Sequence, residues 1–169
     1  MKLTYAEYTQ RYGTSRVTEA EFPPLSYEAC RIMAIHTTGI DGYRKLEWAF
    51  PYIPYDAEAV VMCACKIVDI LWQINTAEES ARLSRGTEET ANGYRGKAIS
   101  SMSAGNESVS YENSASSGGT SIDKAVADSS ARKVLMHEII TEGLSGVSDA
   151  HGVNLLYMGV YPKGLREDV

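Results

Sequence analysis

Apolar and polar positions near the start of the chain alternate at three- and four-residue steps, which is typical of amphipathic helices. A first helix is expected to begin at Thr4, because Thr4 and Glu7 have the spacing of a capping box, and to end at Gly13. A second helix is expected over residues 22–38, where prolines fall only in the first turn. Residues 40–55 mix Gly, Pro and aromatic residues, which predicts an irregular connection laid over the core.

The longest patterned segment follows Asp56, a residue type that favours the N-cap position. Its apolar stripe predicts a long central helix that ends between Thr76 and Arg85. We expect this helix to form the centre of a small helical bundle, with apolar residues from the other helices packed against it. The predicted core residues are Leu25, Ile32, Val60, Ala64, Ile67, Leu71, Ile74, Leu135 and Ile139.

Residues 100–121 are mostly Ser, Gly, Asn and Thr, and such a segment is too polar to bury a core of its own. Within it, residues 108–111 alternate with the period of a strand and residues 104–107 have turn chemistry. A Ser/Gly-rich loop or β-hairpin excursion is therefore predicted over residues 97–121, with its two strands within residues 97–111. A lone hairpin is marginal in water, so Ile99, Val109 and Tyr111 are expected to pair with a neighbour.

A last bundle helix is predicted over residues 122–146, where Gly143 and Gly146 supply stop signals. Residues 147–169 are expected to form an extended C-terminal tail. The tail carries a strongly apolar, strand-like run that consists of Leu155, Leu156, Tyr157, Met158, Gly159, Val160 and Tyr161. A free apolar run is an aggregation hazard, so we expect it to dock on a partner.

These elements predict one mainly α domain: helices in residues 1–96, the excursion at 97–121, the last helix at 122–146 and the docking tail at 147–169. The length of 169 residues fits a single domain. Apolar runs are too short to cross a bilayer, and the N-terminus turns polar too soon for a signal peptide. We therefore expect a soluble protein made in a cytoplasm, with no membrane partner.

Net charge and the counts of cysteine and tyrosine exclude some classes of function and favour another. The net charge of −6 is the wrong sign for a surface that neutralises phosphates, which argues against sequence-specific binding of nucleic acid. Three cysteines cannot all pair, so a disulfide framework is not expected. The chain has 11 Tyr against 2 Phe and 2 Trp. Because Tyr joins a large apolar body to one hydroxyl, this excess favours association with other protein surfaces.

The residues that could catalyse a reaction or bind a metal form no recognised motif. Cys63 and Cys65 lie about 200° apart around a helix and cannot share one zinc ion. His36 and His137 are far apart in sequence, and His36 fits the edge of the core better than the role of a base. Residues 148–151 include Ser, Asp and His but lie in a glycine-flanked turn without a nucleophile elbow. We predict no catalytic residue, metal or cofactor, and no enzymatic activity.

Several sequence blocks, taken in order, carry a family resemblance that covers almost the whole chain. They are Leu3-Thr4-Tyr5-Ala6-Glu7-Tyr8, the helices at 22–38 and 57–70, Glu107-Ser108-Val109-Ser110-Tyr111, Ile139-Ile140, and Leu155-Leu156-Tyr157-Met158-Gly159-Val160. The most specific part is the Ser-Val-Ser-Tyr block, followed by one helix and the Leu-Leu-Tyr-x-Gly-Val terminus. In this order of features the chain resembles the head-tail connector, or adaptor, proteins of tailed bacteriophages.

The resemblance implies a structural virion protein at the head-tail interface, made in the host cytoplasm. Copies of the chain would form a ring, typically twelvefold, that extends the DNA channel beneath the portal and joins the capsid to the stopper or tail. Its partners would be the portal protein, a stopper or other neck or tail protein, further copies of itself, and passing genomic DNA held without sequence-specific contacts. Residues 155–161 would dock on the portal, while Ile99, Val109 and Tyr111 would lie between subunits or face the channel.

Three other interpretations remain open. The chain could be another neck or head-completion protein, such as a stopper or a tail terminator. It could be a helical regulatory interaction domain that acts as a monomer or dimer. It could also be a helical enzyme, which would need a pocket with perturbed titratable groups around His36 or His137.

Overall fold

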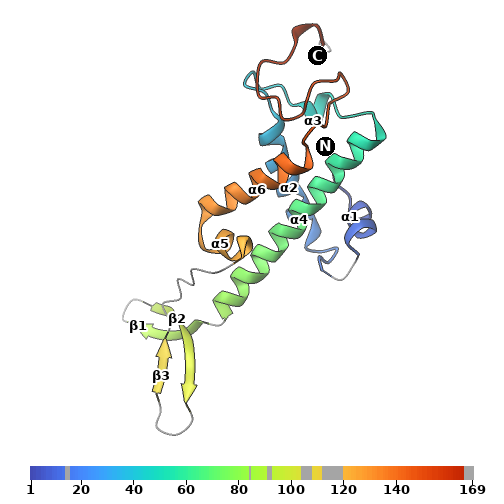
Figure 1. Cartoon of the computed structure of the whole chain (residues 1–169). Helices are drawn as coiled ribbons and strands as arrows, with labels where there is room; N and C mark the ends of the chain where they lie inside the picture. Colours follow the sequence, from blue (N-terminus) through green and yellow to red (C-terminus); the bar gives the residue numbers. More distant parts are fainter. Residues whose placement is uncertain (14–15, 84, 91–92, 104–107, 112–119, 166–169) are drawn as a thin grey trace.

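A computed structural model describes residues 1–13, 16–83, 85–90, 93–103, 108–111 and 120–165, and it is mainly helical (Figure 1). The first helices are α1 (Tyr5–Tyr12), α2 (Phe22–Thr37), α3 (Lys45–Trp48) and α4 (Pro54–Leu83). The strands β1 (Arg85–Thr90), β2 (Gly93–Ser103) and β3 (Ser108–Tyr111) follow. The chain continues through α5 (Ser121–Ala127), α6 (Ser129–Gly143) and the short 3₁₀ helix η1 (Lys163–Leu165). The predicted fold class, a small helical bundle with a β excursion and a C-terminal tail, is confirmed.

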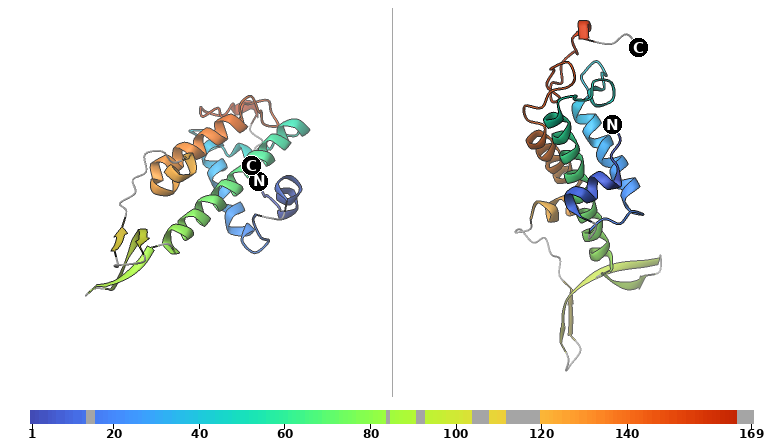
Figure 2. Two further views of the ribbon diagram at one scale, coloured as in Figure 1. Left: turned by 60° about the horizontal axis from the view of Figure 1, so that its bottom comes forward. Right: turned by 90° about the vertical axis from the view of Figure 1, so that its right-hand side faces the viewer.

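Helix α4 is the central element of the bundle, with α1 on one side and α6 on the other (Figures 1 and 2). Val60, Ile67 and Ile74 are fully buried. They lie at seven-residue steps, which is two helical turns, so they form one continuous apolar stripe. The other predicted core residues that the structure buries are Leu25, Ala64, Leu71 and Ile139.

Two predicted core positions are displaced by one residue. Ile32 and Leu135 are only half-buried at the edge of the core. The adjacent residues, Met33 on α2 and Met136 on α6, are buried instead. Each residue turns a helix by about 100°, so a face that is judged from apolar type alone is easily misplaced by one position.

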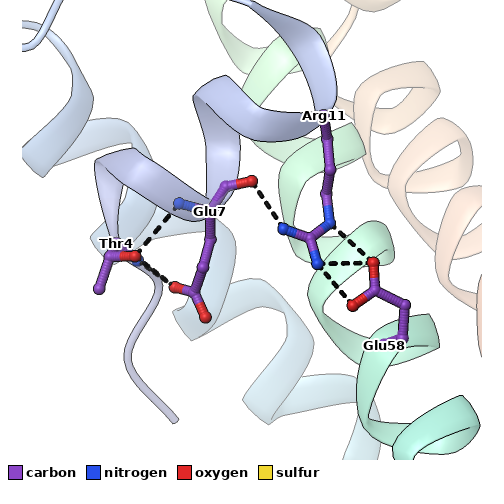
Figure 3. A network of polar contacts seen from close by, with 4 residues as sticks. All are labelled: Thr4, Glu7, Arg11 and Glu58. Atoms are coloured by element: carbon purple, nitrogen blue, oxygen red, sulfur yellow. Dashed lines mark hydrogen bonds and ion pairs between the residues drawn. The ribbon is translucent and has the colours of Figure 1, made fainter.

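Helix α1 begins as its sequence predicts and is fixed to α4 by an ion pair (Figure 3). The Glu7 amide donates to the Thr4 hydroxyl at 3.3 Å, and the Thr4 amide donates to the Glu7 carboxylate at 2.8 Å. Arg11 donates from Nε to Glu58 of α4 at 2.9 Å and from Nη1 to the Glu7 carbonyl at 2.7 Å. Gly13 ends the helix with a φ of 74°, a conformation that favours glycine.

The central helix begins at Pro54, three residues before the first helical position that an N-cap at Asp56 predicts. Proline suits the first helical position because it lacks an amide hydrogen that the helix would leave unpaired. Asp56 is therefore not the N-cap. Its carboxylate instead accepts the amide hydrogen of Ser148 at 3.2 Å, which ties the start of α4 to the C-terminal tail.

The last helix is divided in two, which corrects the prediction of one helix over residues 122–146. Asp128 has extended backbone angles, φ −136° and ψ 124°, between α5 and α6. Its side chain accepts the Ser130 amide at 2.9 Å and so caps α6. The α6 helix then ends at Gly143, where a Cβ would lie 3.0 Å from the Cys63 sulfur of α4.

The excursion also differs from its predicted bounds, because the sheet begins at Arg85 and not at residue 97. Polar, glycine-containing residues of β1 and early β2 lack the period-two apolar pattern by which a strand is recognised. Strand β1 pairs with residues 93–98 of β2, and β3 pairs with residues 99–103, both antiparallel. A register shift between Ile99 and Ser101 bends β2 between its two partners (Figure 2). Residues 104–107 and 112–119 of the predicted excursion lie outside the described residues.

The position of Ile67 at the bundle centre can be tested by truncation. Ile67→Ala is expected to lower the free energy of unfolding by about 2–5 kcal/mol, and the same holds for Leu71→Ala. Met62→Ala, on the exposed face of the same helix, should cost less than about 1 kcal/mol. Urea unfolding measures all three, and equal losses for Ile67→Ala and Met62→Ala would contradict this assignment of the core.

Candidate functional site

Most of the large apolar side chains that the described residues expose belong to segments at the end of the bundle opposite the sheet, and Figure 1 shows where these segments lie. They form two groups. The aromatic loop, which precedes and opens α4, consists of Phe50, Tyr52, Ile53 and Tyr55. The tail patch consists of Ile40, Tyr157, Met158 and Val160. Concentrated exposed apolar surface of this kind marks contact with another macromolecule.

The tail patch is held between two buried anchors. Leu155 and Tyr161 are fully buried on either side of it. The Leu155 amide donates to the Val147 carbonyl at 2.9 Å, and the Tyr161 amide donates to the Asp41 carboxylate at 2.9 Å. Between the anchors, the Ile40 amide donates to the Met158 carbonyl at 2.9 Å. The patch is thus an ordered surface of the bundle.

The sequence predicts a strand-like run over residues 155–161 that docks on a partner, whereas the structure packs part of this run on its own chain. Leu155 and Tyr161 pack on their own chain, and Leu156 is half-buried against the core. Of this run, only Tyr157, Met158 and Val160 remain exposed. The run is irregular because its polar backbone groups bond to side chains and loops, and not to a neighbouring strand. Gly159 allows a close approach, since a Cβ there would clash with the Tyr157 ring.

Lys45 of α3 holds the first anchor in place. Its side chain is fully buried, and Nζ donates to the Leu155 carbonyl at 2.9 Å and to the Tyr157 carbonyl. Nζ also lies 5.9 Å from the centre of the Tyr157 ring. Burial lowers the pKa of Lys45, and the negative charge of Asp149 partly offsets this effect. An ammonium is tolerated there because carbonyl oxygens replace its water.

Tyr161 forms the second anchor through a buried polar cluster. Its hydroxyl donates to the Asp149 carboxylate at 2.7 Å and lies 2.8 Å from Nδ1 of His151. The other Asp149 oxygen accepts the amides of His151 and Val153, each at 2.9 Å. Burial raises the pKa of Tyr161, and the hydrogen bond to Asp149 raises it further. Residues 148–151 thus form a turn that the Asp149 carboxylate stabilises, and Tyr161 of the tail packs against this turn.

A second surface is an open groove of about 990 Å³ between α2, α4 and α6. Its lining includes the apolar residues Leu25, Ile32, Ile35, Leu71, Trp72 and Met136. Charged residues of both signs, among them Glu28, Arg31 and Lys133, also line it.

His36 lines this groove and faces His137 across the α2–α6 contact, with ring centres 5.3 Å apart. Burial lowers the pKa of His36, and His137 lowers it further. The spacing of these histidines in the sequence gave no signal that they would meet. Within the described residues, no three His, Cys, Asp or Glu side chains are grouped so that they could hold a metal ion.

The residues predicted for the excursion lie on neighbouring strands. Ile99 of β2 is the Cα partner of Tyr111 of β3, and Met102 is the partner of Val109. Because β1 and β3 pair with different halves of β2 on opposite sides, each half keeps one edge unpaired within the described strands. Unpaired strand edges are suited to pairing with another chain.

No family model, curated protein or solved structure matches this chain. Among the helices that the structure describes, none has the length and apolarity required to span a membrane.

The role of Lys45 can be tested by removing its charge. Lys45→Met leaves the carbonyls of Leu155 and Tyr157 without their hydrogen-bond donor. An unsatisfied buried group of this kind costs about 1–3 kcal/mol of stability. Hydrogen exchange at the Leu155 and Ile40 amides should therefore accelerate roughly tenfold to a hundredfold. Lys133→Met, which removes an exposed lysine, is the control. Unchanged hydrogen exchange in the tail of the Lys45 variant would contradict the role of Lys45 in holding the tail.

The histidine pair predicts a dependence of stability on pH. The unfolded chain protonates His36 near pH 6.5, whereas the folded chain resists protonation because the pKa of His36 is lowered. Stability should therefore fall as pH falls below about 6.5, until the folded state also takes up the proton. His36→Gln should flatten this part of the profile in urea unfolding. A stable, correctly assembled His36→Gln protein that lacks function would support the enzyme interpretation instead.

Proposed function

We propose that this protein is a head-tail connector of a tailed bacteriophage. Copies of it form a ring beneath the portal, extend the DNA channel and join the capsid to the stopper or tail. The observation that carries the proposal is the tail patch, an ordered apolar surface that buried anchors hold toward solvent. Three of the four patch residues, Tyr157, Met158 and Val160, lie in the Leu-Leu-Tyr-x-Gly-Val segment, which belongs to the most specific part of the family resemblance.

The layout of the chain supports a connecting role. The 30 residues of α4 span about 45 Å, with the tail patch near one end and the sheet beyond the other (Figure 1). A subunit with contact surfaces at both ends of one rigid helix can bind two neighbours at once. The portal would take the tail patch, while the open sheet edges would face neighbouring copies or the channel.

The charge of the chain agrees with passage of DNA. A ring of subunits that each carry a net charge of −6 repels phosphates over much of its surface. Tight binding of DNA would hold the genome in the channel, whereas repulsion lets it slide. Genomic DNA would thus pass without sequence-specific contacts.

Matched substitutions test docking on the portal. Val160→Glu places a charge in the tail patch, and Val134→Glu makes the same change on α6, at side chains that are 55% and 57% exposed. Loss of one buried apolar side chain and desolvation of a carboxylate should weaken binding to the portal more than about tenfold for Val160→Glu. Val134→Glu should bind like the unchanged protein. Equal affinities of both variants in a pull-down titration with purified portal would contradict docking through the tail patch.

The sheet supplies a separate test of assembly. Amides on the open edges of β1, β2 and β3 should exchange rapidly in isolated subunits, because those edges lack a partner within the described strands. In the assembled ring they should be protected if neighbouring copies cover them. Hydrogen exchange measured by mass spectrometry compares the two states. The same exchange rates before and after assembly would mean that the sheet takes no part in the contact.

A further inference from the structure

The groove between α2, α4 and α6 and the aromatic loop are complementary surfaces on one chain. The groove is concave, about 990 Å³ in volume, and has the buried side chains of Leu25, Leu71 and Met136 among its lining residues. The aromatic loop presents exposed side chains, with Tyr52 at 74% and Tyr55 at 81%. Neither surface is covered by another described element.

The two surfaces of one copy cannot meet each other. Tyr55 lies in the first turn of α4, and Asn75 lines the groove from the same helix. The 20 residues between them correspond to about 30 Å along a continuous helix. A loop that is fixed to one end of a rigid helix does not reach a groove near the other end. The loop of one copy can enter only the groove of another.

We propose that the aromatic loop of one copy occupies the groove of the next copy in the ring. This inference rests on the proposed function, since it names the contact through which neighbouring subunits join. The contact is head-to-tail, because a loop meets a groove and not a second loop. Repeated head-to-tail contacts close into rings or continue as open filaments, whereas a self-complementary contact stops at a dimer.

The chemistry of the loop fits the groove. Residues 50–55 carry no charge, so no unpaired charge would be buried on the apolar floor. Pro51 is buried and Pro54 opens α4, and both restrict the backbone, which lowers the entropy lost on binding. The hydroxyls of Tyr52 and Tyr55 can donate to or accept from charged groups such as Glu28 and Arg31 of the groove.

The area of the contact is a large share of what a stable interface requires. Fully buried aromatic side chains remove about 150–250 Å² each, and the four loop side chains are 36% to 81% exposed, so covering them would bury roughly 350–550 Å². A stable interface takes about 800 Å² per partner. The loop and groove would therefore supply about half of the contact, and surfaces beside them would supply the remainder.

Photo-crosslinking tests this contact without removing the aromatic side chain. Tyr52 is replaced by benzoylphenylalanine, and the protein is mixed with an isotope-labelled copy, assembled with or without portal, irradiated and digested. Crosslinks between copies should join the loop to the groove residues within 21–36, 71–80 and 132–136 of the labelled copy. The reciprocal probe at Asn75 should join to residues 50–55. Crosslinks between copies that map to any other surface would overturn the pairing of loop and groove.

A second measurement uses matched charges on α2. Ile35→Glu places a carboxylate in the groove, while Tyr27→Glu changes an exposed residue of the same helix outside its lining. Ile35→Glu should weaken self-association more than about tenfold, and Tyr27→Glu should leave it unchanged. A ring of normal mass from Ile35→Glu would overturn this inference and leave the proposed function standing. An unchanged protein that stays monomeric even with portal would overturn both.

Discussion

The buried ammonium of Lys45, bonded to the carbonyls of Leu155 and Tyr157, is the interaction on which the surface of this molecule depends. A charged group inside a protein is costly unless polar atoms replace its water, so the tail must stay where its carbonyls reach Lys45. Tyr161, fixed by Asp41 and Asp149, holds the other end of the same segment. With both ends fixed, Tyr157, Met158 and Val160 are left exposed.

Because Lys45 and Tyr161 hold the apolar tail on its own bundle, the tail is not a free segment that becomes ordered only when it docks. A flexible apolar tail would lose conformational entropy on docking, and in water it would promote aggregation. A tail that is already ordered on its own bundle avoids most of both costs. The aromatic loop would also lose little conformational entropy on docking, because its prolines and the start of α4 hold it in position. Partners would therefore meet surfaces that are ordered before contact.

Local patterns in the sequence predicted local structure, but they could not predict contacts between residues that are far apart in the chain. The capping box of Thr4 and Glu7 and the stripe of Val60, Ile67 and Ile74 are encoded within a few turns of chain, and both were found. The bond from Lys45 to Leu155 joins residues 110 apart, and the bond from Tyr161 to Asp41 spans 120. No period or motif marks such pairs. The tail was therefore recognised as apolar, but its division into buried and exposed residues was not.

The mass of the purified protein, measured by native mass spectrometry alone and with its portal, tests the proposed function most directly. We predict a complex in which the portal ring carries a closed ring of this chain, typically with twelve copies. Val160→Glu should lose that complex while keeping its helical circular dichroism, because the contacts of Lys45 and the core are untouched. A protein that remains a monomer or dimer, with no mass added to the portal at any concentration, would contradict the account.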